Sequence, residues 1–355
     1  MIGIKFMKSY QVIEFGKPLE LREYENPIPK GEEVLIKISA CGVCHSDLHL
    51  ADGYYDLGNG KKITLADRGT ELPFTPGHEI TGEVVAKGEN SKNVEIGDKG
   101  IVFPWIGCQN CEACKIEKET LCENPKYLGA RLNGGYSDHI MIPNGKYLVP
   151  YGNLNASQAA PYACSGLTAY SALKKIPSTS PDEYILIIGA GGVGTNGILL
   201  APSMHKAKII AIDIDENKRI EAKKIGAHES FSPNQIEEIQ AFCKGKIVGA
   251  IDFVGNEKTT GFAVNIIKKG GTVIVVGLFG GSVSLSLPLI PMRSLNLRGS
   301  YIGELNELKE LVDIIKSGSV NLINVKTVNI SKANEAMDKL RKGKVNGRLV
   351  LQTDI

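Results

Sequence analysis

Four of the eight cysteines form one compact pattern, C-x2-C-x2-C-x7-C, made by Cys108, Cys111, Cys114 and Cys122. Thiolates that fold back within one short loop can converge on a tetrahedral cation, and Zn²⁺ is the usual occupant of such a sulfur cage. A closed four-thiolate site leaves no coordination position open for chemistry. We therefore expect a structural zinc here and look elsewhere for the reaction.

Three further residues could hold a second metal ion: Cys44, His78 and Cys164. Two thiolates and one imidazole leave the fourth zinc position open for water or substrate, as a catalytic site requires. Glu79, next to His78, is a possible additional ligand. Each residue alone is ordinary, because a lone buried cysteine is more often a small core residue than a ligand. Because a cofactor-binding motif occurs in the same chain, a catalytic metal site is a better interpretation of these residues than core packing.

That motif is a glycine-rich turn after an apolar strand. Residues 184–188 read as a buried parallel strand, and a second apolar strand, 208–212, ends at Asp213. The turn between them contains Gly189, Gly191, Gly192, Val193 and Gly194 in the order G-x-G-x-x-G. Such glycines allow a tight turn and close approach of the backbone to a pyrophosphate. With the strand, the following helix and the acidic residue, the pattern predicts a dinucleotide site.

The order of these motifs resembles that of the zinc-dependent medium-chain alcohol dehydrogenases, along nearly the whole chain. The matching segments are Gly42-Val43-Cys44-His45-Ser46-Asp47, Gly77-His78-Glu79, the four-cysteine lobe, Cys164 before Ser165-Gly166-Leu167-Thr168, the glycine-rich turn and Gly347-Arg348. The chain is particularly similar to the tetrameric bacterial and archaeal branch. The resemblance implies oxidation of a primary or secondary alcohol to an aldehyde or ketone, with two zinc ions per chain.

The resemblance also implies roles for the catalytic residues. Cys44, His78 and Cys164 would hold the catalytic zinc, with Glu79 as an occasional or second ligand. Zinc would lower the pKa of the alcohol, and Ser46 would take its proton. The proton would then pass through the cofactor ribose to His49, although His49 could equally be a solvated loop histidine. Asp47 is expected to orient the ligands.

Asp213 indicates the choice of cofactor, because its carboxylate would accept hydrogen bonds from the adenosine ribose and repel a 2′-phosphate. We therefore expect NAD rather than NADP. By resemblance, the other cofactor-binding residues are His45, Thr168, Lys218, Val254, Gly277 and Arg348, of which Arg348 would meet the phosphates. Trp105, the only tryptophan, fits either the core or the substrate pocket. Residues 54–72 are expected to shape the substrate entrance.

The length of 355 residues predicts two or three domains, and the pattern of elements predicts an α/β protein. Residues 1–165 show short strands and tight turns, typical of a mainly antiparallel, GroES-like catalytic domain, with the structural zinc lobe at 104–125. Residues 166–303 alternate strands and helices, typical of a doubly wound parallel-sheet Rossmann domain. The expected strands of this sheet are 184–188, 208–212, 250–254, 272–276 and 295–300. Residues 304–355 are expected to return to the catalytic domain.

Composition excludes several classes of partner. The net charge of +2 indicates no nucleic-acid partner, and no apolar run approaches the roughly 18 residues of a membrane helix. Residues 1–20 lack a signal-peptide pattern, so thiols at ligand spacing favour a reducing cytoplasm. Residues 1–6 are expected to precede the first strand as a short extension.

Two alternatives stay open. A zinc polyol or sugar dehydrogenase is the nearest, although the apolar run Phe103-Pro104-Trp105-Ile106 favours simple alcohols. The cysteine lobe could instead be an iron–sulfur or zinc-ribbon binding module, although its four glutamates disfavour nucleic acid. A homodimer joined at the 295–303 strand or a homotetramer is expected.

Overall fold

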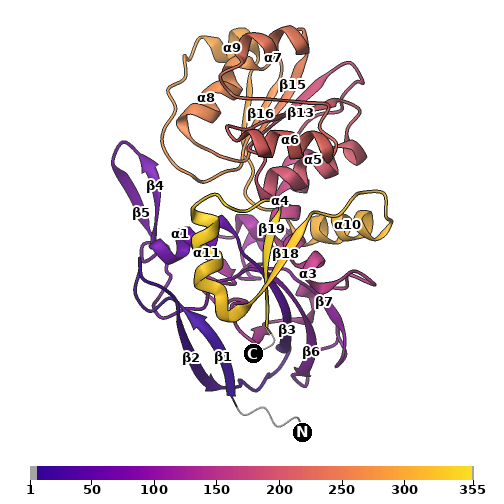
Figure 1. The fold of residues 1–355 in the computed structure, drawn as a ribbon. Coiled ribbons are helices and arrows are strands. Elements are labelled where there is room, and N and C mark those ends of the chain that lie inside the picture. Colours follow the sequence, from indigo (N-terminus) through magenta and orange to yellow (C-terminus); the bar gives the residue numbers. More distant parts are fainter. Residues whose placement is uncertain (1–5, 354–355) are drawn as a thin grey trace.

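The computed structural model describes residues 6–353, which form two halves that meet along a central helical layer (Figure 1). In the lower half, a 7-stranded sheet has the order β11-β7-β6-β3-β19-β18, with β10 beside β3. These strands are β3 (Val34–Gly42), β6 (Glu79–Lys87), β7 (Lys99–Val102), β10 (His139–Ile142), β11 (Leu148–Val149), β18 (Val325–Asn329) and β19 (Arg348–Gln352). All of their pairings are antiparallel except that of β18 with β19.

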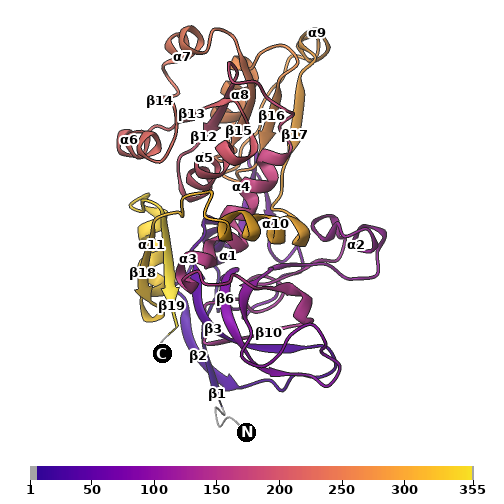
Figure 2. The same cartoon turned by 90° about the vertical axis from the view of Figure 1, so that its right-hand side faces the viewer.

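Smaller elements surround this sheet. The paired strands are β1 (Phe6–Gln11) with β2 (Glu20–Glu25), β4 (Tyr54–Gly58) with β5 (Lys61–Thr64), and β8 (Trp105–Ile106) with β9 (Lys126–Tyr127). The helices are α1 (His45–Asp52), α2 (Glu112–Lys115), α3 (Ala156–Ala159) and α11 (Ala333–Arg341). The β4–β5 hairpin projects beside the junction of the two halves, and the lobe that carries α2 protrudes from the body in the turned view (Figure 2).

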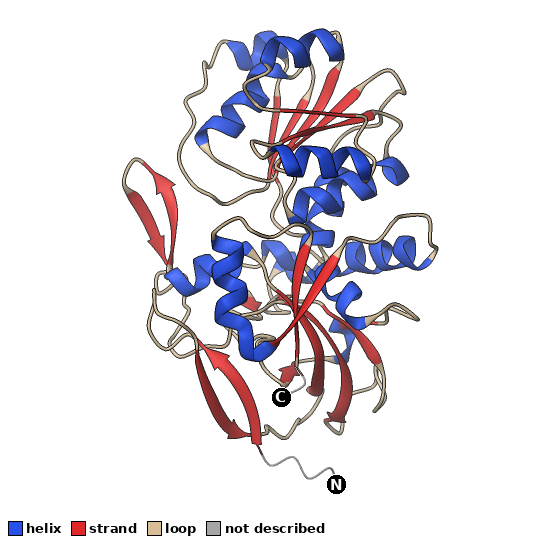
Figure 3. Cartoon of the chain, in the orientation of Figure 1, coloured by secondary structure: helices blue, strands red, loops and turns tan. Residues whose placement is uncertain are grey.

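The upper half is a 6-stranded parallel sheet of order β14-β13-β12-β15-β16-β17 with helices on both faces (Figure 3). Its strands are β12 (Tyr184–Ile188), β13 (Lys208–Ile212), β14 (Glu229–Phe231), β15 (Ile247–Asp252), β16 (Thr272–Val275) and β17 (Asn296–Gly299). Its helices are α5 (Gly192–Met204), α6 (Glu216–Lys224), α7 (Ile236–Cys243), α8 (Glu257–Ile266) and α9 (Leu289–Arg293). The expected α/β class, with an antiparallel GroES-like part and a doubly wound sheet, is confirmed.

Two expectations for the parallel sheet need correction. Strand β15 ends at Asp252 rather than at Val254, because the Asp252 carboxylate accepts hydrogen bonds from the backbone N–H groups of Val254 and Gly255 and turns the chain. Strand β14 was not predicted, since the short Glu229–Phe231 segment has no apolar run and its pairing with β13 provides the strand. The expected return of residues 348–352 to the first sheet is confirmed by the pairing of β19 with β3.

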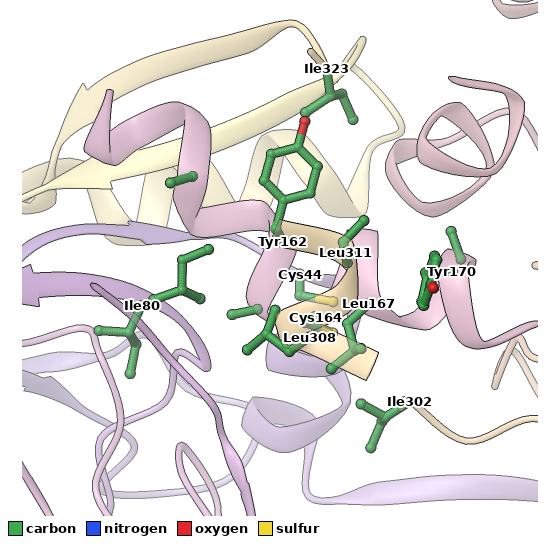
Figure 4. Packing of buried hydrophobic residues seen from close by; sticks show 14 of the residues in the cluster. Cys44, Ile80, Tyr162, Cys164, Leu167, Tyr170, Ile302, Leu308, Leu311 and Ile323 are labelled. Carbon is green, nitrogen blue, oxygen red and sulfur yellow. The ribbon is translucent and has the colours of Figure 1, made fainter. Parts of the chain in front are cut away.

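A shared hydrophobic core joins the halves. Helices α4 (Ser165–Lys174) and α10 (Leu305–Lys316) cross this layer and pack against each other. In Figure 4, Leu308 and Leu311 of α10 and Leu167 of α4 lie beside Cys44 and Cys164. The ligand candidates are therefore embedded in packed apolar surroundings. Of the expected extension 1–6, Phe6 belongs to β1, and the remainder lies outside the described residues.

Candidate active site and metal centres

The start of α1 positions the first ligand candidate. Cys44 is the N-cap residue, and Asp47 at the third helical position accepts a hydrogen bond from the Cys44 backbone N–H at 2.8 Å. A carboxylate at this place satisfies an unpaired N–H of the helix start and complements the helix dipole. The local sequence thereby fixes where the Cys44 side chain points.

Asp47 connects this turn to the second ligand candidate. It is fully buried and accepts hydrogen bonds from the Gly77 N–H at 3.2 Å and the Tyr136 hydroxyl at 3.1 Å. The same carboxylate lies 3.1 Å from Nδ1 of His78. With Nδ1 engaged, the buried Nε2 of His78 has no hydrogen-bond partner among the described residues. A carboxylate on one imidazole nitrogen and a free second nitrogen is the usual arrangement of a metal-binding histidine.

Cys44, His78 and Cys164 form one buried group whose ligand atoms all lie within 4.8 Å of one another. The hydrogen bond between the two thiols lowers the pKa of Cys44 well below its ordinary value, and the same contact raises that of Cys164. A divalent ion would allow both sulfurs to be thiolates and would also take up the free His78 nitrogen, so the three residues fit zinc.

Glu79 does not join this group. One carboxylate oxygen accepts a hydrogen bond from the Ser165 backbone N–H at 3.0 Å, and the other forms an ion pair with Arg348. Burial raises the pKa of Glu79, although Arg348 acts against this rise. The expectation that Glu79 is an occasional or second ligand is thus corrected for this structure, because a buried guanidinium takes its carboxylate.

The four clustered cysteines converge as their spacing predicts. Cys111 Sγ lies 3.5 Å from Cys114 Sγ and 3.8 Å from Cys122 Sγ, and Cys108 completes the group. A tetrahedral zinc with Zn–S bonds of about 2.3 Å separates its sulfurs by about 3.8 Å. The four thiols are free of disulfide bonds and fit a closed zinc site.

Hydrogen bonds connect the lobe that holds these cysteines to Tyr147 on one side and to the start of α10 on the other. Buried Glu119 accepts hydrogen bonds from the Gly107 N–H at 2.7 Å and the Tyr147 hydroxyl at 2.8 Å. Glu304, which caps α10, binds the side chain of Thr120, and Asn306 donates to Glu117 at 2.7 Å. A metal ion in the lobe would therefore stabilise its junction with the helical layer.

Two adjoining cavities lie between the halves. The first, of about 370 Å³, is lined by the three catalytic ligand candidates and by Ser46, His49, Trp105, Thr168 and Gly277. The second, of about 180 Å³, is lined by Gly189, Gly191, Gly192, Gly194, Asp213, Lys218, Val254 and Arg348. Cys44, His45 and Val193 line both. The structure thus brings every predicted site residue to these cavities except Glu79, Cys108, Cys111 and Cys114. The fourth lobe cysteine, Cys122, lines the first cavity.

The glycine-rich turn requires glycine at two of its positions, because a side chain there would meet other parts of the protein. A Cβ on Gly194 would lie 1.8 Å from the Gly189 carbonyl oxygen, and a Cβ on Gly192 would lie 2.5 Å from Cδ of Arg348. Asp213 anchors this turn, since its carboxylate accepts hydrogen bonds from the Ala190 N–H at 2.8 Å and the Asp215 N–H at 2.9 Å. The second cavity therefore fits a dinucleotide with its pyrophosphate at the start of α5.

His49 lies one helical turn beyond Ser46, at the opposite end of α1 from the ligand. Its ring is 5.1 Å from the ring of Tyr55 and 6.4 Å from that of Phe279. Burial lowers the pKa of His49, so the imidazole is neutral near pH 7 and able to accept a proton. Arg341 pairs with Asp52 through two 2.7 Å contacts and holds the end of α1 against α11.

Several residues of the first cavity were not predicted from the sequence. They are Tyr55, Leu65, Arg68, Thr70, Tyr127, Arg131, Phe279 and Tyr301. The expectation that residues 54–72 shape the entrance is the one sequence signal that points to any of them. Of the apolar run 103–106, Trp105 alone lines this cavity, and the Phe103 ring stacks on Tyr147 instead.

Comparisons with known proteins agree with this arrangement. Residues 30–153 match the family described as alcohol dehydrogenase GroES-like domain, and residues 192–317 match the zinc-binding dehydrogenase family. The chain is 37% identical over 350 residues to the NAD-dependent alcohol dehydrogenase of Sulfurisphaera tokodaii, covering 97% of this chain and 99% of that protein. It has the same identity and coverage with the NAD-dependent alcohol dehydrogenase of Saccharolobus solfataricus.

A solved structure has the same fold. The alcohol dehydrogenase of Aeropyrum pernix superposes with a TM-score of 0.88 at 28% identity, over 98% of this chain and all of that one. Within the described residues, no helix is long and apolar enough to cross a membrane.

Proposed function

The chain belongs to the zinc-binding alcohol dehydrogenase family, and we propose that it interconverts an alcohol and the corresponding aldehyde or ketone with NAD in the two adjoining cavities. The observation that carries this proposal is the meeting of Cys44, His78 and Cys164 in the cavity that adjoins the glycine-rich turn. When bound, zinc supplies Lewis acidity to the substrate oxygen and NAD accepts the hydride.

The chain's own residues then hold and move the proton. Ser46 takes the proton of the substrate hydroxyl, since its side chain lines the cavity two residues after Cys44. His49 receives the proton on its way to solvent. Asp47 holds His78 with Nε2 free, and the ring of Trp105, 5.7 Å from that of His78, excludes water from one side.

Asp213 selects the cofactor. Its carboxylate lies at the end of β13, lines the second cavity and stays 9% exposed. A negative charge there favours ribose hydroxyls and disfavours a 2′-phosphate. Lys218 and Arg348 contact the cofactor from the same cavity.

We also propose a domain organisation, an oligomeric state and a cellular compartment for this protein. The catalytic part comprises residues 1–165 and 304–355, and the cofactor part comprises residues 166–303. A homodimer or homotetramer is supported by β17, an edge strand whose Leu297 is exposed, near exposed Leu289 and Met292. A reducing compartment such as the cytoplasm suits two ligand sets that need thiolates.

Metal analysis and steady-state assays with NAD test the function. Cys164→Ala should lose one zinc per chain and all turnover of primary and secondary alcohols. Cys41→Ala is the matched control, because Cys41 is an equally buried thiol of β3 outside the ligand group. Full turnover by Cys164→Ala would overturn the proposed function, and one zinc per chain in the folded wild type would refute the assignment of two zinc sites.

A further inference from the structure

An arginine stands among the aromatic residues of the first cavity. The ring of Trp105 lies 5.7 Å from that of His78. The rings of Tyr127 and Tyr301 lie 5.0 and 5.6 Å from that of Trp105. Beyond them, the Arg68 guanidinium lies 5.4 Å from the centre of the Tyr55 ring. The zinc-ligand candidates, a group of aromatic rings and a positive charge thus line the same cavity.

Among the residues that the structure describes, the Arg68 guanidinium has no acidic partner. No ion pair links Arg68 or Arg131 to a carboxylate within residues 6–353. Burial raises the pKa of Tyr127 and of Tyr301, and the charge of Arg68 acts against both rises. The one carboxylate among the described lining residues, Glu123, is exposed. A half-buried guanidinium has lost part of its hydration shell. Phenol groups replace these interactions only incompletely, because they carry no negative charge.

The position of Arg68 is fixed by its backbone. Arg131 donates from Nε to the Arg68 carbonyl oxygen at 2.8 Å and from Nη1 to the Pro125 carbonyl oxygen at 3.1 Å. The turn itself closes through hydrogen bonds from the Arg68 and Thr70 N–H groups to the Leu65 carbonyl oxygen. A second guanidinium therefore holds the first in place and adds to the positive potential.

We propose that Arg68 binds an anionic group of the substrate, so that the enzyme acts on short alcohols or aldehydes that carry a carboxylate at the far end. The inference rests on the proposed function and specifies its substrate class. Guanidinium groups bind carboxylates and phosphates through two parallel hydrogen bonds, and the intervening rings suit the methylene chain between the two polar ends. A phosphate ester would share this chemistry, and the test separates the two.

The kinetic test compares substrates of equal length on the zinc- and NAD-loaded enzyme. For the wild type, kcat/KM for 4-hydroxybutanoate should exceed that for 1-butanol, and 3-hydroxypropyl phosphate against 1-propanol shows whether phosphate serves as well. Arg68→Gln should lower kcat/KM for the favoured anion by about 10- to 100-fold, as expected for a lost hydrogen-bonded charge pair. It should change the value for the neutral alcohol by less than about 3-fold, and Arg68→Lys should restore part of the loss.

Lys62→Gln is the matched control. It removes one positive charge from the same 54–72 segment, but Lys62 lies over the Tyr54 ring at 3.7 Å and does not line the cavity. It should leave the ratio of anionic to neutral kcat/KM unchanged. Equal losses in Lys62→Gln and Arg68→Gln would mean that only general charge steers the substrate, and would overturn the assignment.

A binding measurement gives a readout besides turnover. Trp105 is the only tryptophan and lines the cavity, so its fluorescence reports occupancy. Titration of the zinc-loaded enzyme without NAD, which has no hydride acceptor and cannot turn over, should show tighter binding of 4-hydroxybutanoate than of 1-butanol in the wild type and no preference in Arg68→Gln. A preference that survives Arg68→Gln would mean that the anion binds elsewhere. Turnover of neutral alcohols without any preference would refute the inference alone, whereas no NAD-linked turnover of any alcohol would refute the proposed function as well.

Discussion

The carboxylate of Asp47 offers a sharp test of how the catalytic ligands are held. Its four contacts are the Cys44 and Gly77 N–H groups, the Tyr136 hydroxyl and Nδ1 of His78. In Asp47→Asn one oxygen remains, and the amide N–H₂ replaces the other. Two of the four contacts then lose their acceptor. At about 1.5–3 kcal/mol for each hydrogen bond to a charged group, the free energy of unfolding should fall by about 3–6 kcal/mol.

The more specific consequence concerns the tautomer of His78. If the amide donates to Nδ1, the imidazole proton moves to Nε2, the nitrogen that faces the two thiols. A protonated Nε2 cannot bind metal, so zinc affinity at this site should fall by about 10- to 100-fold. Tyr136→Phe is the control, because it removes one neutral donor to the same carboxylate and leaves the charge and the tautomer intact.

Zinc retention against a competing chelator measures this effect. The chelator concentration is set so that the wild type keeps two zinc ions per chain. The zinc content of Asp47→Asn should fall toward one ion per chain. Tyr136→Phe should keep two zinc ions, and its free energy of unfolding should fall by only about 1.5–3 kcal/mol. Equal zinc loss in both variants, or full retention by Asp47→Asn, would refute the role assigned to the carboxylate.

Four further outcomes are expected. Cys111→Ser should lower the melting temperature in differential scanning calorimetry, because a structural zinc contributes folding free energy, and an unchanged melting temperature would argue against metal in the lobe. In fluorescence titrations, Asp213→Ser should weaken the binding of NAD by about 1–3 kcal/mol and strengthen the binding of NADP. A wild type that already prefers NADP would contradict the assignment. Because burial lowers the pKa of His49, the acid limb of kcat for alcohol oxidation should lie below the ordinary histidine value of about 6.5. His49→Ala should slow oxidation by about 10²-fold at most and be rescued by imidazole, Ser46→Ala should not be rescued, and equal losses without rescue would remove His49 from the proton path.

Local features of the chain determined much of this protein. The four lobe cysteines lie close together in sequence, so their spacing alone restricts the loop to a sulfur cage. The glycine-rich turn joins the apolar strand β12 to α5, and the next strand, β13, is apolar after its first residue, Lys208. Both strands form as expected, because a parallel sheet covered on both faces requires such runs. The Cys44 turn is equally local, since Asp47 caps the helix that begins after Cys44.

Packing between distant segments decided the rest. Glu79 follows His78 in sequence, yet its carboxylate turns to Arg348, which reaches it only because β19 pairs with β3. Strand β14 exists through its partner β13, as no periodic pattern marks it. Arg68 and Tyr301 come from opposite halves of the fold and line the same cavity, and neither has a motif that predicts this arrangement. A sequence encodes such neighbours only through the summed packing of the whole chain, so the zinc and nucleotide chemistry could be predicted, whereas the charge in the substrate cavity required the tertiary structure.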